Sequence, residues 1–299
     1  MGMPNPVFRS KAFQGPVQQA KQEQHAGYQQ AQGYRQQPYG AAGQPAAGHP
    51  SQASPANTMS SDQLSQMYQQ PSATAADTGR MTFGSVINRT SLVFLMIVAG
   101  AVFGWTFANP VNNAGIYFIA LAVGFVFGLI NAFKREPSPV MISIYAVAQG
   151  VFLGGISALF ELQWPGIVFQ AVLATLSVFA VVLALFRSGK VRATPKMNRI
   201  FMIAMVSYLV FSLLNFVLMI TGAIDGMFGL RSGWLGIVIG LLAVVMASYS
   251  LVMDFTSIEE GVRAGVPERY SWPAAFGLAA TMIWLYIEIL RILAIFNQD

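Results

Sequence analysis

Seven long apolar runs, separated by short polar segments, dominate the chain from Ser91 onward. Each run has about the 20 residues that an α-helix needs to cross the hydrocarbon layer of a membrane. Breakers stand in several connections, at Pro110, in "EPSP" (136–139) and in "WPG" (164–166). The pattern predicts an all-α integral membrane protein with seven transmembrane helices over residues 85–299. The runs cover residues 91–108, 115–133, 140–160, 166–186, 200–221, 234–254 and 274–296.

Residues 1–80 have a different composition. They hold 16 Gln among many Gly, Ala, Pro and Ser, in tracts such as "YQQAQGYRQQPYG". Such a segment has too little apolar surface to offset the entropy of ordering it. We therefore expect a disordered cytoplasmic tail, with weak self-association through its spaced tyrosines as the less favoured alternative. The tail lacks the apolar core of a signal peptide and the Cys of a lipoprotein anchor.

Composition excludes several classes of protein. Hydrophobic residues make up 55% and charged residues 10% of the chain, where a soluble domain carries roughly 25% charged residues. The absence of Cys excludes disulfides, thiolate nucleophiles and Cys-ligated zinc. Both histidines, His25 and His49, lie in the polar tail, so no imidazole is expected in the membrane. We expect no cofactor.

The basic residues indicate the orientation in the membrane. Arg80 and Arg89 precede the first run, Lys134 and Arg135 follow the second, and the loop at 187–199 has five bases and no acid. The alternate loops carry little charge. This asymmetry places the tail and the basic loops in the cytoplasm and the C-terminus outside a plasma membrane. The formal net charge of +5 therefore reflects topology, and no nucleic-acid partner is expected.

Four pairs of glycines at positions i and i+4 fall within the apolar runs. Such pairs allow helix backbones to approach closely in lipid. Because they lie on four different runs, close packing within a monomer is favoured over dimerisation through one of them. The pairs are Gly100 with Gly104, Gly124 with Gly128, Gly150 with Gly154, and Gly236 with Gly240.

Enzymatic interpretations find little support. The apolar part has no His for serine proteolysis and no H-E-x-x-H zinc motif. An intramembrane aspartyl dyad needs two Asp residues, and Asp254 alone is available. No Lys lies in the last run for a retinal Schiff base, and no P-loop pattern occurs. We expect that the protein is not an enzyme.

Two acids fall inside or at the end of apolar runs. Asp254 lies where the sixth run ends, in a helix expected to continue to about Ala264, and Glu288 lies near the middle of the seventh. A charge in the membrane costs at least ~2.5–3.5 kcal/mol and is a functional hypothesis by default. Two plain interpretations compete with it. Glu288 could simply neutralise Arg291, three residues away on the same helix face, and Asp254 could sit in headgroup water.

Three motifs resemble those of the Bax inhibitor family of membrane proteins. "LYIEILRIL" (285–293) resembles the family's final-helix signature, and "SLVMDFT" (250–256) resembles its Asp-Thr motif at the end of helix six. "AQGVFLGGISALF" (148–160) is similar to its third-helix Glu-Gly segment. The resemblance covers residues from about 85 to 298. The opening "MPNPVFRSKAF" looks like that of a bacterial branch with long polar tails, which implies the bacterial inner membrane.

This chain departs from the family's motifs at several positions, one of the two acids among them. Where the family has Asp and Asn in the final helix, this chain has Glu288 and Arg291, and Gln149 replaces the third-helix Glu. Phe255 separates Asp254 from the Thr of the Asp-Thr motif. A cation beside Glu288 favours its ionised form, which weakens proton sharing with another acid.

The resemblance implies a pH-sensitive cation leak, chiefly of calcium, gated by Asp254 and Glu288. Two carboxylates close together at low dielectric share a proton, and losing it creates repulsion and a hard-oxygen site for transient calcium. Arg291, Gln149 and Ser250, which lie within the matching motifs, are the expected supporting residues. The resemblance also implies an alternative, a regulator that transports nothing and binds membrane proteases or other membrane proteins.

The loop charges give a testable topology. A reporter fused after Lys196 should be cytoplasmic, and one fused at Asp299 should be external. Paired alkaline phosphatase and fluorescent-protein fusions measure both positions. A cytoplasmic C-terminus would contradict the seven-span count.

Overall fold

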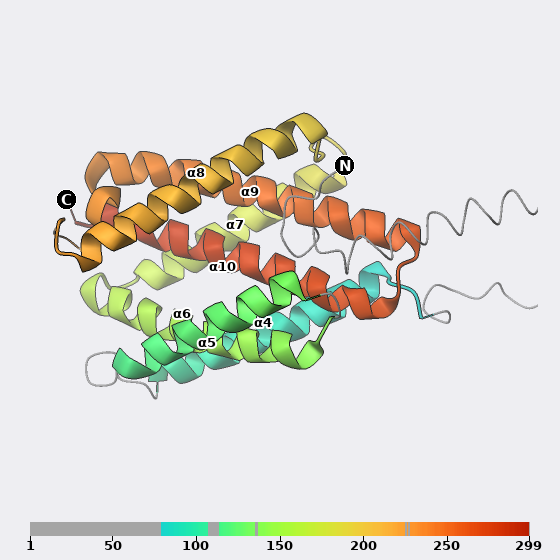
Figure 1. The fold of residues 1–299 in the computed structure, drawn as a ribbon, viewed down its shortest axis with the longest axis horizontal. Coiled ribbons are helices and arrows are strands. Elements are labelled where there is room, and N and C mark those ends of the chain that lie inside the picture. Colours follow the sequence, from blue (N-terminus) through green and yellow to red (C-terminus); the bar gives the residue numbers. More distant parts are fainter. Residues whose placement is uncertain (1–78, 107–113, 135–136, 225, 227, 299) are drawn as a thin grey trace, which may run out of the picture.

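The computed structural model describes residues 79–106, 114–134, 137–224, 226 and 228–298 (Figure 1). These residues form long α-helices and two short 3-10 turns, η2 and η3, and the only β pairing among them is the isolated bridge between Arg80 and Pro267. The helices are α4 (Phe83–Thr106), α5 (Ala114–Phe133), α6 (Pro139–Gln163), α7 (Ile167–Arg187), α8 (Pro195–Ile220), α9 (Gly233–Ala264) and α10 (Ser271–Phe296), with η2 (Gly229–Arg231) and η3 (Glu268–Tyr270).

All seven helices are long and apolar enough to cross a membrane, which confirms the predicted fold class. The prediction that α9 continues to about Ala264 is also confirmed, because the helix ends there and Gly265 follows in the left-handed conformation, with φ of 64°. Glycine adopts this conformation without the steric cost that a side chain would bring. The protein is therefore a multi-pass membrane protein.

Helix α4 starts earlier than the apolar run that predicted it. Ser85 N donates to Thr82 Oγ1 and Thr82 N donates to Ser85 Oγ, each over 3.0 Å, which is the reciprocal arrangement of a capping box. Met81 and Val86 stand in the positions of a hydrophobic staple and are buried in one core cluster. These local contacts begin the helix at Phe83, before the apolar run that starts at Ser91.

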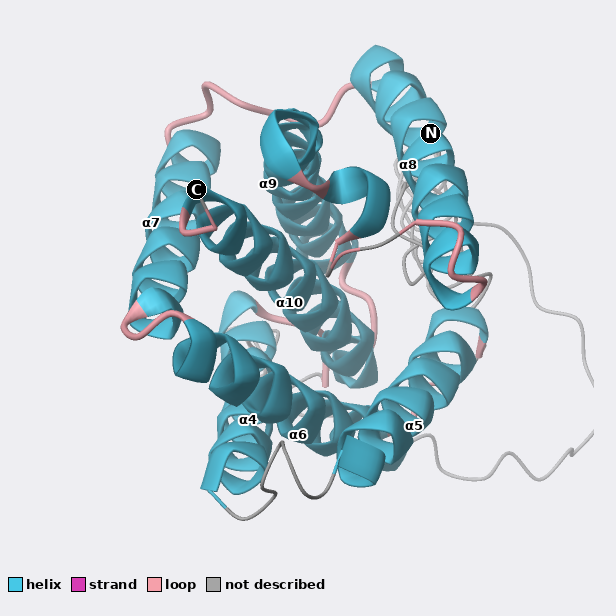
Figure 2. Cartoon of the chain, turned by 90° about the vertical axis from the view of Figure 1, so that its left-hand side faces the viewer, coloured by secondary structure: helices cyan, strands magenta, loops and turns pink. Residues whose placement is uncertain are grey.

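Helix α10 runs through the middle of the bundle, and the other six helices surround it (Figure 2). Of its most apolar 18-residue window, 72% is buried inside the protein, the highest share of the seven spans. Its polar side chains bond to neighbouring helices. Ser271 Oγ lies 2.7 Å from Ser85 Oγ of α4, and Tyr286 Oη lies 2.6 Å from Ser157 Oγ of α6.

The paired glycines pack helices together within one chain. A Cβ added to Gly154 would lie 2.0 Å from the carbonyl oxygen of Ala101, and one added to Gly104 would lie 2.3 Å from that of Val151. Both distances are far shorter than any real contact, so α4 and α6 touch backbone to backbone here. The packing role expected for the glycine pairs is confirmed at this contact.

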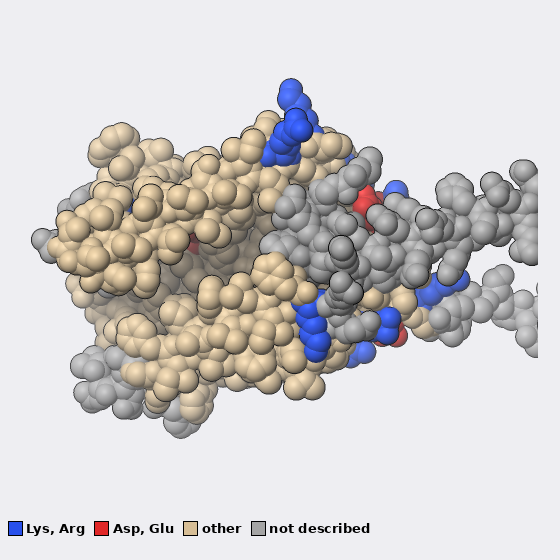
Figure 3. Space-filling view, viewed as in Figure 1, with Lys and Arg blue, Asp and Glu red and all other residues tan. Residues whose placement is uncertain are grey.

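Helix α8 is the least embedded of the seven. Only 6% of its most apolar window is buried, and Phe201 and Asn215 are its only buried residues. It packs chiefly on η2 and on α9. In the space-filling view the molecule is hollowed between α8 and the helices below it (Figure 3). Most of α8 therefore faces lipid, and few contacts hold it to the bundle.

Most of the described Lys and Arg residues gather toward one end of the bundle, which we call the basic end (Figure 3). It includes Arg89, Lys134 and the 187–199 loop, as the alternation of the helices requires. Arg231 lies in the α8–α9 connection, at the opposite end. The loops rich in basic residues thus lie at the same end of the folded bundle. The side of the membrane to which each end belongs stays a prediction.

The folded part begins slightly before residue 85. Met81 N donates to Val266 O over 2.7 Å and Glu268 N donates to Gly79 O over 2.8 Å, so the segment from Gly79 is bound to the α9–α10 connection. Gly79 and Arg80, assigned to the tail from composition, belong to the folded part. Residues 1–78, on which the prediction of a disordered tail rests, lie outside the described residues.

The contact between α4 and α6 can be tested with two alanine substitutions. Gly154→Ala should destabilise the protein by about 1–3 kcal/mol, because its methyl group overlaps the Ala101 carbonyl. Gly115→Ala on α5 is the matched control, since a Cβ there meets nothing within 4 Å. Thermal unfolding in detergent measures both. Equal melting temperatures would contradict the close approach.

Candidate functional site

The hairpin between α9 and α10 determines which residues face each other. Gly265, Val266 and Pro267 join the two helices through the short turn η3. Asp254 lies ten residues before the end of α9 at Ala264, and Thr281 lies ten residues after the start of α10 at Ser271. At ~1.5 Å per residue both are about 15 Å from the hairpin. Asp254 therefore lies level with Thr281.

Asp254 is completely buried and bonds across this hairpin. Thr281 Oγ1 donates to Asp254 Oδ2 over 2.7 Å, and Ser250 Oγ, one turn earlier on α9, lies 3.3 Å from Thr281 Oγ1. Ser250, an expected supporting residue, therefore lies in one chain of oxygens with Asp254, and its role stays a prediction. The interpretation that Asp254 sits in headgroup water does not agree with its burial.

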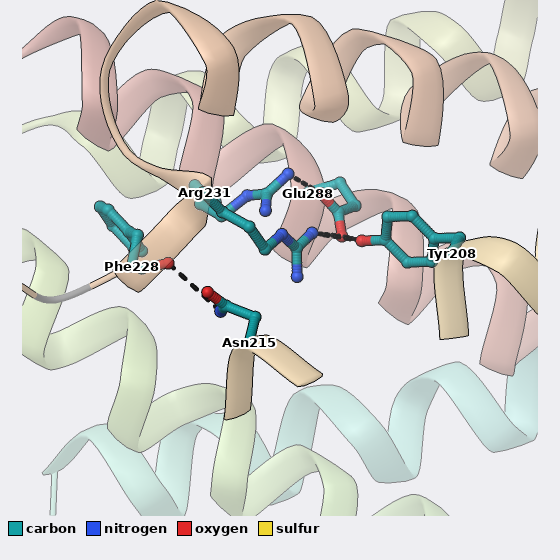
Figure 4. Close-up of polar contacts among 6 residues, drawn as sticks. Tyr208, Asn215, Phe228, Arg231 and Glu288 are labelled. Atoms are coloured by element: carbon teal, nitrogen blue, oxygen red, sulfur yellow. Dashed lines mark hydrogen bonds and ion pairs between the residues drawn. The ribbon is translucent and has the colours of Figure 1, made fainter. Parts of the chain in front are cut away.

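Glu288 belongs to a second polar cluster, formed by three elements (Figure 4). Tyr208 of α8 donates to Oε1 of Glu288, and Nη2 of Arg231 donates to the same oxygen over 2.7 Å and also to Tyr208 Oη. Arg291 donates to Oε2 from the same helix. Glu288 thus accepts hydrogen bonds from three donors, as an ionised carboxylate can. We call Tyr208, Arg231, Glu288 and Arg291 the arginine cluster.

The loop that carries Arg231 is held in place by Asn215 of α8. Asn215 Oδ1 accepts from Leu230 N over 2.7 Å, and its Nδ2 donates to the carbonyl of Phe228 over 3.3 Å. Gly229 between them has φ of 56°, and a Cβ there would lie 2.6 Å from Asn215 Oδ1. Only glycine lets the loop approach α8 this closely. Asn215 therefore fixes η2, and η2 directs Arg231 toward Glu288.

The two predicted gating acids lie at different depths. Glu288 is seven residues beyond Thr281 on α10, or about 10 Å along the helix axis at ~1.5 Å per residue. The hairpin thus aligns Asp254 with Thr281, and the bonds of Glu288 go to Tyr208, Arg231 and Arg291. A proton shared directly between the two acids would require α9 and α10 to slide by about two turns.

The arginine cluster is buried and carries more positive than negative charge. Glu288 is 4% and Arg291 is 6% exposed, and the side chain of Arg231 is 15% exposed. Two guanidinium groups therefore share one carboxylate. The ion pair of Glu288 and Arg291, on which the competing interpretation of Glu288 rests, is present. A Cβ on Gly240 of α9 would lie 2.5 Å from Ile292 Cγ1 and 3.2 Å from Arg291 Nη2, so this glycine lets α9 pack closely on both side chains.

Gln149 lies in another part of the bundle. Its side chain packs on Gly124 of α5, whose Cβ, if added, would lie 3.1 Å from the amide carbon. Its buried Oε1 has no hydrogen-bond partner among the described residues. The structure therefore places Gln149 at the α5–α6 contact, and its expected role beside Asp254 and Glu288 has no support from these contacts.

Sequence reasoning missed Thr281, Tyr208 and Arg231. Thr281 and Tyr208 are neutral residues in apolar runs, where a single hydroxyl is common and gives no signal. Arg231 lies between the fifth and sixth apolar runs, and its sequence position does not reveal that this connection turns back into the bundle. A weak signal existed in Asn215, a lone amide in the fifth apolar run.

Seven membrane-length helices, six of them around a central helix that carries buried ionisable groups, define the class of this protein, a polytopic helical membrane protein with an internal ion network. Residues 5–298 match the family described as Bax inhibitor 1 like, and the chain belongs to that family. The resemblance stated from the sequence motifs is thereby confirmed. No curated protein and no solved structure matches the chain.

The arginine cluster makes a prediction about stability. Glu288→Gln should destabilise the protein by about 3–5 kcal/mol, because it leaves two buried guanidinium groups without a counter-charge. Glu259→Gln is the matched control. Glu259 also binds two arginines, Arg192 and Arg263, whose side chains are 42% and 76% exposed. Its loss should cost about 0–1 kcal/mol.

Thermal unfolding in one detergent measures both variants. If Glu288→Gln is no more harmful than Glu259→Gln, the cluster is hydrated and does not act as a buried ion network.

Proposed function

We propose that the protein is a gated cation leak, with calcium the favoured ion, and that the described conformation is closed. The observation that carries this proposal is the placement of Asp254 and Glu288 at two levels of the central hairpin, buried among lipid-facing helices. Ionisable residues are expensive in the membrane and mark the routes of ions and protons. A purely structural hairpin would not need them.

The arginine cluster keeps the pathway closed to cations in this proposal. A cation moving along α10 from Asp254 would meet two guanidinium groups and one carboxylate at the next level. A ring of net positive charge is an electrostatic barrier to cations in a narrow pathway. Arg231 reaches the cluster from a loop. If it moves away from Glu288, the barrier falls and Arg291 alone balances the charge of Glu288. Movement of η2 is therefore the opening step in this proposal.

Asp254 supplies the contact for the ion. Its carboxylate and the hydroxyls of Thr281 and Ser250 are hard oxygen ligands of the kind that calcium prefers. Among the described residues no group of three or more His, Cys, Asp or Glu could hold a metal ion, so the contact suits passage rather than storage. Deprotonation of Asp254 provides the negative charge that attracts the ion, so calcium flux should rise with pH.

Calcium entry into dye-loaded proteoliposomes tests this proposal. Asp254→Asn should lower the flux and remove its dependence on pH between 5 and 8, since an amide cannot titrate. Arg231→Gln should raise the flux by at least about tenfold, which a barrier change of about 1.4 kcal/mol already produces. Arg192→Gln, which changes a base that pairs with Glu259 at the basic end, is the matched control and should leave the flux unchanged.

Two results would contradict the proposal. Folded protein that leaks no calcium at any pH would favour the non-transporting regulator. A pH dependence that Glu288→Gln also abolishes would restore the shared proton between Asp254 and Glu288, against the separation of the two levels.

A further inference from the structure

The arginine cluster has hydrogen-bond donors that the described residues leave unused. Arg231 and Arg291 each hold Glu288 through Nη2. Nε of Arg231 and both Nε and Nη1 of Arg291 are buried and have no hydrogen-bond partner among the described residues. Burying a charged donor without a partner is strongly unfavourable. Three such donors on two neighbouring side chains therefore point to a missing acceptor.

The charge balance shows what kind of acceptor fits. Two guanidinium groups and one carboxylate leave one positive charge at this level. Tyr208 donates to Glu288 and adds no negative charge. A water molecule could accept hydrogen bonds but would leave the charge uncompensated, whereas a monovalent anion meets both needs. The unused nitrogens are shielded from solvent, which favours a monatomic ion over a carboxylate or phosphate.

We propose that Arg231 and Arg291 bind a halide ion, chloride in the cell, beside Glu288. The side chain of Arg231 is the more exposed of the two, so the ion enters from the end of the bundle at which α10 finishes. Gly240 of α9 packs closely on this part of α10, because a Cβ there would lie 2.5 Å from Ile292 Cγ1 and 3.2 Å from Arg291 Nη2. The site does not depend on the protein conducting cations.

The melting temperature of the full chain in detergent tests the site directly. Sodium chloride or bromide should raise it by roughly 2–4 °C over sodium gluconate at equal ionic strength, because an ion that binds only the folded state stabilises it. The rise should saturate with halide concentration, as binding to one site does. Arg231→Gln should lose the rise, and Arg192→Gln, which removes a base that is not in the cluster, should keep it.

Asp225, six residues before Arg231 in the same loop, is one other source of negative charge, and it lies outside the described residues. If its carboxylate fills the site, wild type shows no halide effect and Asp225→Asn gains one, which overturns the proposal. A halide effect that never saturates, or that persists in Arg231→Gln, overturns it as well. If Arg231→Gln fails to fold, the wild-type protein decides the question. A melting temperature that rises and saturates with halide concentration supports the site, and one that does not overturns it.

Discussion

Most of helix α10 is buried inside the bundle, so the polar side chains that it carries need partners there. Four of them bond to a different neighbouring helix at successive levels, and Arg291 bonds to Glu288 within α10. Apolar side chains are as well placed in lipid as in protein, so such polar contacts and close backbone packing determine how membrane helices associate. The rotation and height of α10 thus follow from its partners. The pairs are Ser271 with Ser85 of α4, Thr281 with Asp254 of α9, Tyr286 with Ser157 of α6, and Glu288 with Tyr208 of α8.

The helices could be predicted because membrane thickness sets the length of an apolar run, and the glycine pairs could be predicted because close packing in lipid needs small residues. The site could be predicted only in part. Asp254 and Glu288 stand out as charges in apolar sequence, but their partners depend on how α9 and α10 align at the hairpin. Helix ends predicted from sequence are uncertain by several residues, which is about one turn or ~5.4 Å along the axis. An error of that size would place another residue of α10, in place of Thr281, opposite Asp254.

The two levels of the hairpin have opposite electrostatic character. Asp254 accepts a hydrogen bond from the Thr281 hydroxyl, and oxygens of this kind suit a cation, whereas around Glu288 guanidinium groups outnumber the carboxylate. The departures from the final-helix signature, Glu288 and Arg291, both fall at the second level and change its charge. The departure at the first level, Phe255 beside Asp254, is apolar and adds no charge there.

The attachment of η2 to α8 by Asn215 has a mechanical consequence. Helix α8 faces lipid over most of its length, and lipid-facing helices change their tilt when the hydrocarbon layer becomes thicker or thinner. Because Asn215 binds the loop that carries Arg231, and Tyr208 is on the same helix, a tilt of α8 moves two of the three ligands of Glu288 together. Bilayer thickness thereby becomes a physical input to the ion network at the centre of the protein.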